Sequence, residues 1–199
     1  MVEEPEEFYS SGAEKFDERH SIDNMPQEYI DLLDRFVELV DSGRVLDAGC
    51  GPGRDTDYFS RNGLEAVGVD LAEGMLGQTE DKRGEFHRMD VRDLEFSDGD
   101  FEGVWCNTVL HFFPRDEMED VVSELSRVTQ ENGIIFVSFK LGDETIEREA
   151  FGSSVEQHLV PRAFALNLCQ DQGEIIETAE GETPSGFKVF SVFFRNGGI

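Results

Sequence analysis

The chain has 199 residues, enough to bury one substantial core, and 38% of them are hydrophobic, including 17 Phe. Acidic residues outnumber basic ones by 44 to 17, which gives a formal net charge of −27 at pH 7. The well-patterned apolar segments exclude intrinsic disorder, and no run approaches the roughly 20 apolar residues of a membrane span. The acidic first residues lack the basic start of a secretory signal. We therefore expect a soluble, cytoplasmic protein.

The acidic residues are spread through the whole chain, and only four of the basic residues are lysines. This pattern predicts a solvated acidic surface, as carried by halophilic proteins that work in molar salt. Such a surface repels phosphate backbones, which argues against a nucleic-acid partner. The three cysteines, Cys50, Cys106 and Cys169, lie far apart in apolar or glycine-rich surroundings. We expect them to be buried and reduced, and we expect no metal site.

From residue 44 onward, short apolar runs alternate with amphipathic ones, the pattern of a parallel sheet covered by helices. The predicted strands are Arg44 to Ala48, Glu65 to Val69, Glu85 to Met89, Phe101 to Cys106, Gly133 to Phe139, Glu174 to Ala179 and Phe187 to Phe194. The turn-rich GETPSG separates the last two, which predicts an antiparallel hairpin at one sheet edge.

Helical spacing of apolar residues predicts a helix that starts near Pro26 and ends before Gly43. Further helices are predicted over residues 116–129 and, with a weaker pattern, 161–172. Together these elements predict an α/β fold: a doubly wound, Rossmann-like, seven-stranded and mostly parallel sheet with helices on both faces. We expect one domain over residues 1–199, with 1–43 as a helical cover and 44–199 as the core.

A glycine-rich turn, VLDAGCGPG, follows the first predicted strand and leads into a helix. Its glycines permit a tight turn with positive φ and let a ligand approach the backbone closely. The next strand ends at Asp70, roughly 20 residues after Gly51, the distance at which a carboxylate meets the two hydroxyls of a ribose. A turn without a ligand would explain neither Asp47 nor three glycines within five residues. These features predict a nucleoside-containing cofactor.

The elements from the first to the fifth predicted strand contain the segments DAGCGPGRD, VGVDLAEGML, RMDVRDL, FEGVWCNTVLHFFPRDEM and LSRVTQENGIIFVSF. Together, these segments resemble the class I S-adenosylmethionine-dependent methyltransferases, of the small single-domain type that acts on small molecules. The N-terminal FYSSGAEKFDERH is similar to the tyrosine-containing segment that often covers the cofactor in this family. Where the family often has two glycines before the fifth strand, this chain has Asn132 and Gly133; asparagine also tolerates the left-handed conformation.

The resemblance implies how the chain would hold S-adenosylmethionine. The residues implied around its methionine part are Asp47, Gly49, Gly51, Gly53, Asn107 and Thr108. Those implied around its nucleoside are Asp70 at the ribose, Leu71 and Val91 against the adenine, and Asp90 at the adenine amino group. Arg54 would pair with the methionine carboxylate or form an outward salt bridge. Tyr9 and His20 would belong to the cover, with an exposed N-terminal helix as the alternative.

The implied reaction is an in-line displacement at the sulfonium methyl, for which the protein mainly aligns the reactants and excludes water. His111 is the candidate catalytic base because it follows the fourth strand at the edge where ligands bind. The alternative is a histidine packed between Leu110 and Phe112 with a satisfied hydrogen bond. His87 and His158, expected on a strand and in a polar loop, have no predicted role. The phenylalanines that could form an acceptor pocket or belong to the core are Phe112, Phe113, Phe139 and Phe151.

The acceptor is expected to be a small molecule. Residues 107–110 read NTVL, whereas the base-amino-methylating members of this superfamily have Asn/Asp-Pro-Pro-aromatic there. We expect a monomer or homodimer without nucleic-acid or membrane partners. Two alternatives stay open: a non-catalytic S-adenosylmethionine-binding regulator, and a nicotinamide-dependent oxidoreductase. The fingerprint of the oxidoreductase, however, requires glycine where this chain has Arg54.

Overall fold

The computed structural model describes residues 2–183 and 186–198. Its helices are α1 (Pro5–Arg19), α2 (Gln27–Val40), α3 (Arg54–Arg61), α4 (Glu73–Leu76), α5 (Arg115–Val128) and α6 (Arg162–Gln170), with two 3-10 turns, η1 (Ile22–Asn24) and η2 (Leu110–Phe112). The strands are β1 (Arg44–Ala48), β2 (Glu65–Asp70), β3 (Glu85–Arg88), β4 (Phe101–Cys106), β5 (Thr129–Lys140), β6 (Thr145–Ala150), β7 (Ser153–His158), β8 (Gly173–Glu182) and β9 (Lys188–Asn196).

Within the described residues, seven strands form one sheet in the order β3-β2-β1-β4-β5-β9-β8. The first five run parallel, and β9 runs antiparallel to both β5 and β8. The predicted α/β fold and the hairpin at the sheet edge are therefore confirmed. Residues 184–185 of the predicted GETPSG turn lie outside the described residues. Asn132 has the expected left-handed φ of 67°.

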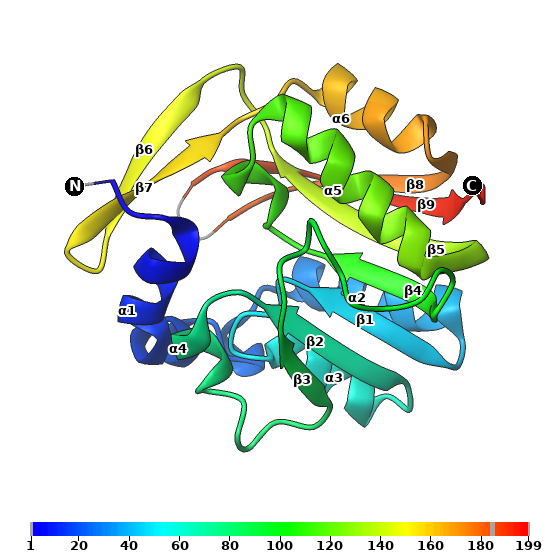
Figure 1. The fold of residues 1–199 in the computed structure, drawn as a ribbon, viewed down its shortest axis with the longest axis horizontal. Helices are drawn as coiled ribbons and strands as arrows, with labels where there is room; N and C mark the ends of the chain where they lie inside the picture. Colours follow the sequence, from blue (N-terminus) through cyan, green and yellow to red (C-terminus); the bar gives the residue numbers. More distant parts are fainter. Residues whose placement is uncertain (1, 184–185, 199) are drawn as a thin grey trace.

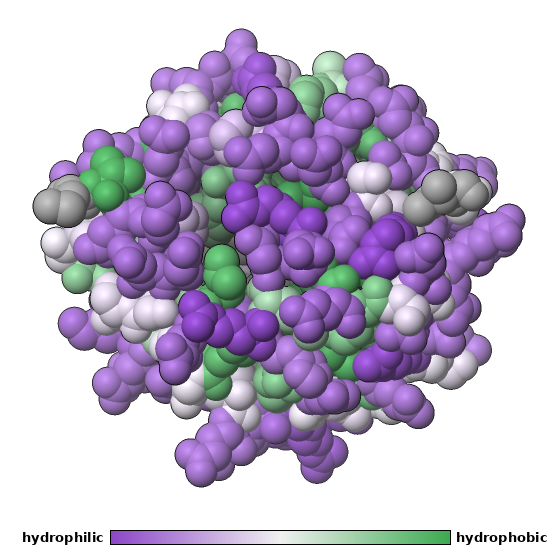
Figure 2. Space-filling model, viewed as in Figure 1, coloured by the Kyte–Doolittle hydropathy of each residue, from purple (hydrophilic) through white to green (hydrophobic). Residues whose placement is uncertain are grey.

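Each face of the sheet buries its own apolar cluster. Alternate strand residues point to opposite faces, so Trp105 packs with Phe36 of α2 and Phe59 of α3, while its neighbours in β4 face the other side. That second cluster includes Val121, Val122 and Leu125 of α5 and Leu168 of α6. Figure 1 shows α5 and α6 together over one part of the sheet. In Figure 2, hydrophilic residues cover most of the viewed face, and hydrophobic ones show mainly in its recesses.

A second, two-stranded sheet, β6–β7, was not predicted from the sequence. The two strands pair antiparallel across a tight turn at Phe151 and Gly152, both with positive φ. Helix α1 packs against this hairpin: the ring of Phe8 lies 5.4 Å from that of Phe151. Figure 1 shows α1 and the hairpin together at the end of the molecule toward which the arrows of β1, β2 and β4 point. Among the described residues, no helix is long and apolar enough to cross a membrane.

Candidate functional site

A cavity of about 1280 Å³ opens at the carboxyl ends of the parallel strands. Open α/β sheets bind ligands at this edge, because the loops that leave adjacent strands diverge there. The predicted site residues that line the cavity are Tyr9, His20, Asp47, Gly49, Gly51, Arg54, Asp70, Leu71, Asp90, Val91, Asn107, Thr108 and His111. Gly53 does not line it. A Cβ on Gly53 would lie 2.7 Å from the ring of Phe86, so this glycine lets α3 start close to β3.

The glycine turn is joined to the end of β2 through Asp70. One carboxylate oxygen of Asp70 accepts the backbone N–H of Gly51 at 2.8 Å, and the other accepts that of Ala72 at 2.8 Å. Gly51 has a φ of 54°, and a Cβ built on it would meet nothing within 4 Å. Each Asp70 oxygen keeps capacity for another hydrogen bond. Burial raises the pKa of Asp70, and the backbone hydrogen bonds from Ala72 and Gly51 oppose that shift.

The neighbouring part of the cavity is largely apolar. It is lined by Leu71, Ala72, Met75 and Val91. Asp90 stands at its rim, where Arg92 forms an ion pair with it at 2.7 Å. Hydrogen bonds from Arg92 lower the pKa of Asp90, which therefore remains ionised and available as an acceptor.

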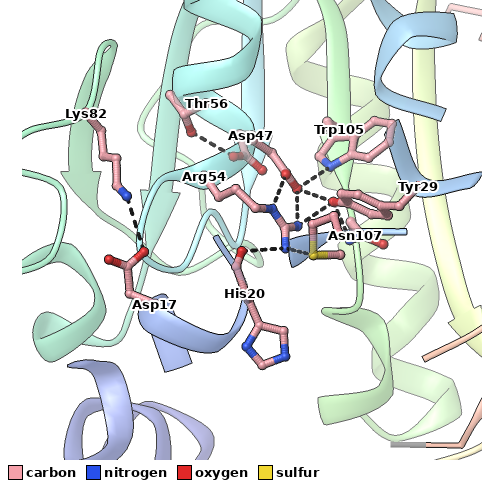
Figure 3. Close-up of polar contacts among 11 residues, drawn as sticks. Asp17, His20, Tyr29, Asp47, Arg54, Thr56, Lys82, Trp105 and Asn107 are labelled. Atoms are coloured by element: carbon pink, nitrogen blue, oxygen red, sulfur yellow. Dashed lines mark hydrogen bonds and ion pairs between the residues drawn. The ribbon is translucent and has the colours of Figure 1, made fainter. Parts of the chain in front are cut away.

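Arg54 lies at the centre of a buried polar network (Figure 3). Its Nε and Nη2 donate to the two carboxylate oxygens of Asp55 at 2.6 and 2.9 Å, and Nη2 also donates to the Tyr29 hydroxyl at 2.6 Å. Tyr29 in turn donates to Asp55. Of the two alternatives for Arg54, the salt bridge is present, with the neighbouring Asp55, but it does not point outward: the Arg54 side chain is only 14% exposed, because the first turn of α3 is buried.

Asp47 lies beside this network and faces the same cavity. It accepts a hydrogen bond from the Thr56 hydroxyl at 2.7 Å and is 2% exposed. Burial, followed by the nearby charge of Asp55, raises the pKa of Asp47 to about 8, against weaker opposition from Thr56 and Arg54. Asp47 is therefore mostly protonated at pH 7 and has to release its proton before it can pair with a positively charged ligand.

Asn107 and Thr108 are held in place by residues that the sequence analysis did not single out. Asn107 donates to the Tyr29 hydroxyl at 2.9 Å, and its carbonyl oxygen accepts from Ser138 at 2.8 Å. Ser138 also accepts the backbone N–H of Thr108 at 2.8 Å, where the chain has a left-handed φ of 56°. Tyr29 and Ser138 belong to a helix and a strand that were predicted, but no local motif marks them.

Helix α1 covers one side of the cavity. The ring of Tyr9 contacts that of Phe112 edge-on at 5.5 Å, and its hydroxyl accepts from Arg148 at 3.0 Å. The ring of His20 stacks on that of Phe16, with the ring centroids 4.0 Å apart. Burial is the largest cause that lowers the pKa of His20. Figure 3 shows the ion pair of Asp17 with Lys82, which joins α1 to the segment after α4. The alternative of an exposed N-terminal helix is wrong, because α1 buries Phe8 and Ala13.

His111 lines the cavity from η2 and is buried. Neither ring nitrogen has a hydrogen-bond partner among the described residues, so the alternative of a packed histidine with a satisfied hydrogen bond is not what the structure shows. Burial, then the charges of Lys140, Arg148 and His158, lowers the pKa of His111 well below 6.5. The ring is therefore neutral at pH 7 and keeps a free lone pair.

The structure decides between the two alternatives for the four phenylalanines and corrects the expectation for one histidine. Phe112 and Phe113 line the cavity, whereas Phe139 belongs to the main core and Phe151 packs against α1. His158 does not lie in a polar loop. It ends β7, lines the cavity and contacts Glu156 at 3.3 Å.

Comparisons with known proteins identify relatives of part of the chain and solved structures with the same fold. Residues 45–133 match the model of a family described as a methyltransferase domain. A malonyl-[acyl-carrier protein] O-methyltransferase of Enterobacter lignolyticus is 33% identical over 94 residues, which are 46% of this chain and 37% of that protein. The chain thus spans well under half the length of this relative. A Pyrococcus horikoshii structure superposes with a TM-score of 0.71 at 21% identity, over 96% of this chain and 98% of that one. The magnesium protoporphyrin IX methyltransferase of Synechocystis, solved with bound S-adenosylmethionine, gives 0.68 at 19% identity, over 85% and 78%.

Proposed function

We propose that this chain, which belongs to the class I S-adenosylmethionine-dependent methyltransferases, binds S-adenosylmethionine in the cavity and transfers its methyl group to a small-molecule acceptor. The observation that supports this most directly is the Asp70 carboxylate at the edge of the open space beside Gly51. A carboxylate fixed by two backbone N–H groups can accept two further hydrogen bonds from adjacent hydroxyls. The ribose of a nucleoside offers such a pair.

The remaining residues fit the other parts of the same cofactor. Leu71, Met75 and Val91 offer an apolar surface for adenine, with Asp90 at its rim as an acceptor for the amino group. Asp47 would accept the ammonium of the methionine part, and Arg54 would attract its carboxylate. When bound, the cofactor supplies an electrophilic methyl on a sulfonium. The chain's residues then have to hold the acceptor in line and exclude water.

For His111 we propose the role of base or hydrogen-bond acceptor toward the acceptor molecule. A neutral imidazole with an unused lone pair can take a proton from a nucleophile that lies within reach. We propose that α1, which supplies Tyr9 and His20 to the cavity wall, acts as the cover that keeps water out. A regulator that binds the cofactor without catalysis is the second candidate, and methylated product formed from a panel of acceptors would exclude it.

Replacing Asp70 by Ala should weaken the binding of S-adenosylhomocysteine by about 1 to 3 kcal/mol, because the ribose hydroxyls would lose their acceptor. Isothermal titration calorimetry measures this directly. Asp81→Ala is the matched control, since Asp81 is exposed and lies outside the cavity wall. Equal affinity of the Asp70→Ala variant and the unmodified chain would contradict the proposed cofactor site.

The affinity for S-adenosylhomocysteine should rise by up to about tenfold per pH unit between pH 6 and 7. Asp47, whose pKa is about 8, is mostly protonated in this range and must release its proton to accept the ligand's ammonium. Calorimetry in buffers of different ionisation enthalpy would detect that proton. Asp47→Asn should abolish the release. Affinity of the unmodified chain that does not vary with pH would show that Asp47 does not meet the ammonium.

A further inference from the structure

Two basic residues without carboxylate partners among the described residues, Lys140 and Arg148, line the cavity next to the β6–β7 hairpin, in a wall that also contains Glu156. Lys140 at the end of β5 is the one lysine or arginine among the described residues that is fully buried, at 4% exposure. Its ammonium donates to the side-chain oxygen of Gln157 at 2.8 Å and lies 4.8 Å from the ring of Phe187. No carboxylate of the described residues lies within 4.0 Å of it. A buried ammonium without a counterion is costly, and an anion bound beside it would stabilise its charged form.

Arg148 of β6 adds a second positive charge to the same wall. It donates to the Tyr9 hydroxyl at 3.0 Å, and within the described chain it too forms no ion pair. In a protein with 44 acidic residues, two neighbouring cations without carboxylate partners are unexpected. Burial first, and then the charge of Arg148, lower the pKa of Lys140 to about 7, so the two cations lie within electrostatic reach of each other.

Side chains along β6 and β7 alternate between the two faces of the hairpin, so Arg148 and the neighbouring acids lie on opposite faces. Residues paired across β6–β7 share a face, and successive residues alternate between faces. Arg148 pairs with Val155, and both line the cavity, as part of the face that also carries buried Gln157. The acids Glu147 and Glu149 lie on the other face and are exposed. The hairpin therefore turns its cation inward and these acids outward.

His111 is the third residue of this group, after Lys140 and Arg148. Its buried imidazole has no partner among the described residues and lines the same cavity. We infer that Lys140, Arg148 and His111 form an anion-binding subsite, and that the methyl acceptor is a small molecule with a carboxylate or phosphate group held there. The inference deepens the proposed function and depends on it. The hydroxyl of Tyr9 accepts from Arg148 at 3.0 Å, and Tyr9 and Asp70 line the same cavity as the subsite.

The test uses the full chain saturated with S-adenosylhomocysteine and three small probes: benzoate, phenyl phosphate and the neutral benzamide. Calorimetry or ligand-observed NMR at one fixed chloride concentration should show binding of at least one anion about tenfold or more tighter than benzamide. Preference between benzoate and phenyl phosphate would tell a carboxylate site from a phosphate site. Equal affinity for all three probes would overturn the inference while leaving the cofactor site intact.

Variants locate the subsite and separate it from the cofactor. Lys140→Gln and Arg148→Gln should each weaken binding of the preferred anion about tenfold and leave S-adenosylhomocysteine binding unchanged. Arg148 is half-buried on the hairpin, so its variant keeps the test valid even if Lys140→Gln fails to fold. Lys188→Gln is the matched control, because it removes one positive charge from an exposed position outside the cavity wall.

Competition between benzoate and S-adenosylhomocysteine would instead assign Lys140 and Arg148 to the cofactor's own carboxylate and overturn the inference. Failure of the unmodified chain to bind S-adenosylhomocysteine would contradict the proposed function itself.

Discussion

Raising potassium chloride from millimolar to molar concentration should increase the thermal unfolding midpoint of this chain by about 10 °C or more. The formal charge of −27 is carried by a single chain of 199 residues, so many carboxylates must lie near one another. Their repulsion extends over about 10 Å at 0.1 M salt and only about 3 Å at 1 M. Relief of a few kcal/mol shifts the midpoint of a domain of this size by roughly 2 to 4 °C per kcal/mol.

The structure contains places where this repulsion is direct. Glu147 and Glu156 face each other across the β6–β7 pair on its exposed side, and like charges in such cross-strand positions are destabilising. The arginines that could offset the surplus are largely engaged already, for example Arg115 with Asp143 and Arg162 with Glu180. The hairpin is thus a segment whose stability should depend on salt.

Thermal unfolding followed by circular dichroism over a potassium chloride series would measure the effect. Glu156→Gln should raise the midpoint in low salt and change it little in molar salt, because it removes one of the two facing charges. Glu28→Gln, at an exposed site on α2, controls for the loss of a charge without a facing acid across a strand pair. A midpoint that stays flat from millimolar to molar salt would contradict the halophilic interpretation and leave the proposed function untouched.

The sheet was predictable because its elements carry strong local signals. Strands β1, β2, β4 and β5 each contain a short apolar run, and Gly43 marks the chain reversal before β1. The β6–β7 hairpin was missed for an equally physical reason. Its turn has Phe151 at a φ of 55°, where two-residue hairpins usually have Asn, Asp or Gly, so the usual turn signal is absent. Packing of Phe151 against Phe8 and Gly12 of α1 accompanies this conformation, and such tertiary contacts are not readable from local sequence.

The candidate site likewise contains residues that a sequence motif predicted and residues that only the folded structure reveals. Asp47, Gly51 and Asp70 stand in a motif with fixed spacing, and the structure brings all three to one cavity. Tyr29 and Lys140 line the same cavity, and Ser138 holds Asn107 beside it, but the sequence patterns of their helix and strand indicate only burial. Their positions depend on how α2 and β5 pack around the first motif. The residues proposed to bind the cofactor were therefore predictable from their motif, whereas the residues that hold them in place and the proposed anion subsite needed the folded structure.

Replacing Arg54 by Met should lower the free energy of unfolding by about 3 to 5 kcal/mol, the cost of leaving a buried charge without its partner. Asp55 is nearly buried, with 8% of its side chain exposed, and Arg54 binds both of its carboxylate oxygens. Without the guanidinium, Asp55 would keep only neutral donors, Tyr29 and the indole of Trp105 at 3.2 Å. Asp47 would also lose the nearby positive charge that opposes the rise of its pKa.

The neighbouring Arg61 supplies a matched control on the same helix. It also pairs with an aspartate, Asp57 at 2.7 Å, but its own side chain is 58% exposed. Arg61→Met should therefore cost at most about 1 kcal/mol. Chemical denaturation in molar salt would compare the two variants where surface charges are screened. If the cost at Arg54 comes from the uncompensated carboxylate, adding Asp55→Asn to Arg54→Met should restore part of the lost stability, because the buried charge is then gone. A loss at Arg54 no larger than that at Arg61 would mean that the buried network does not stabilise the fold, and would leave attraction of the ligand's carboxylate as its remaining role.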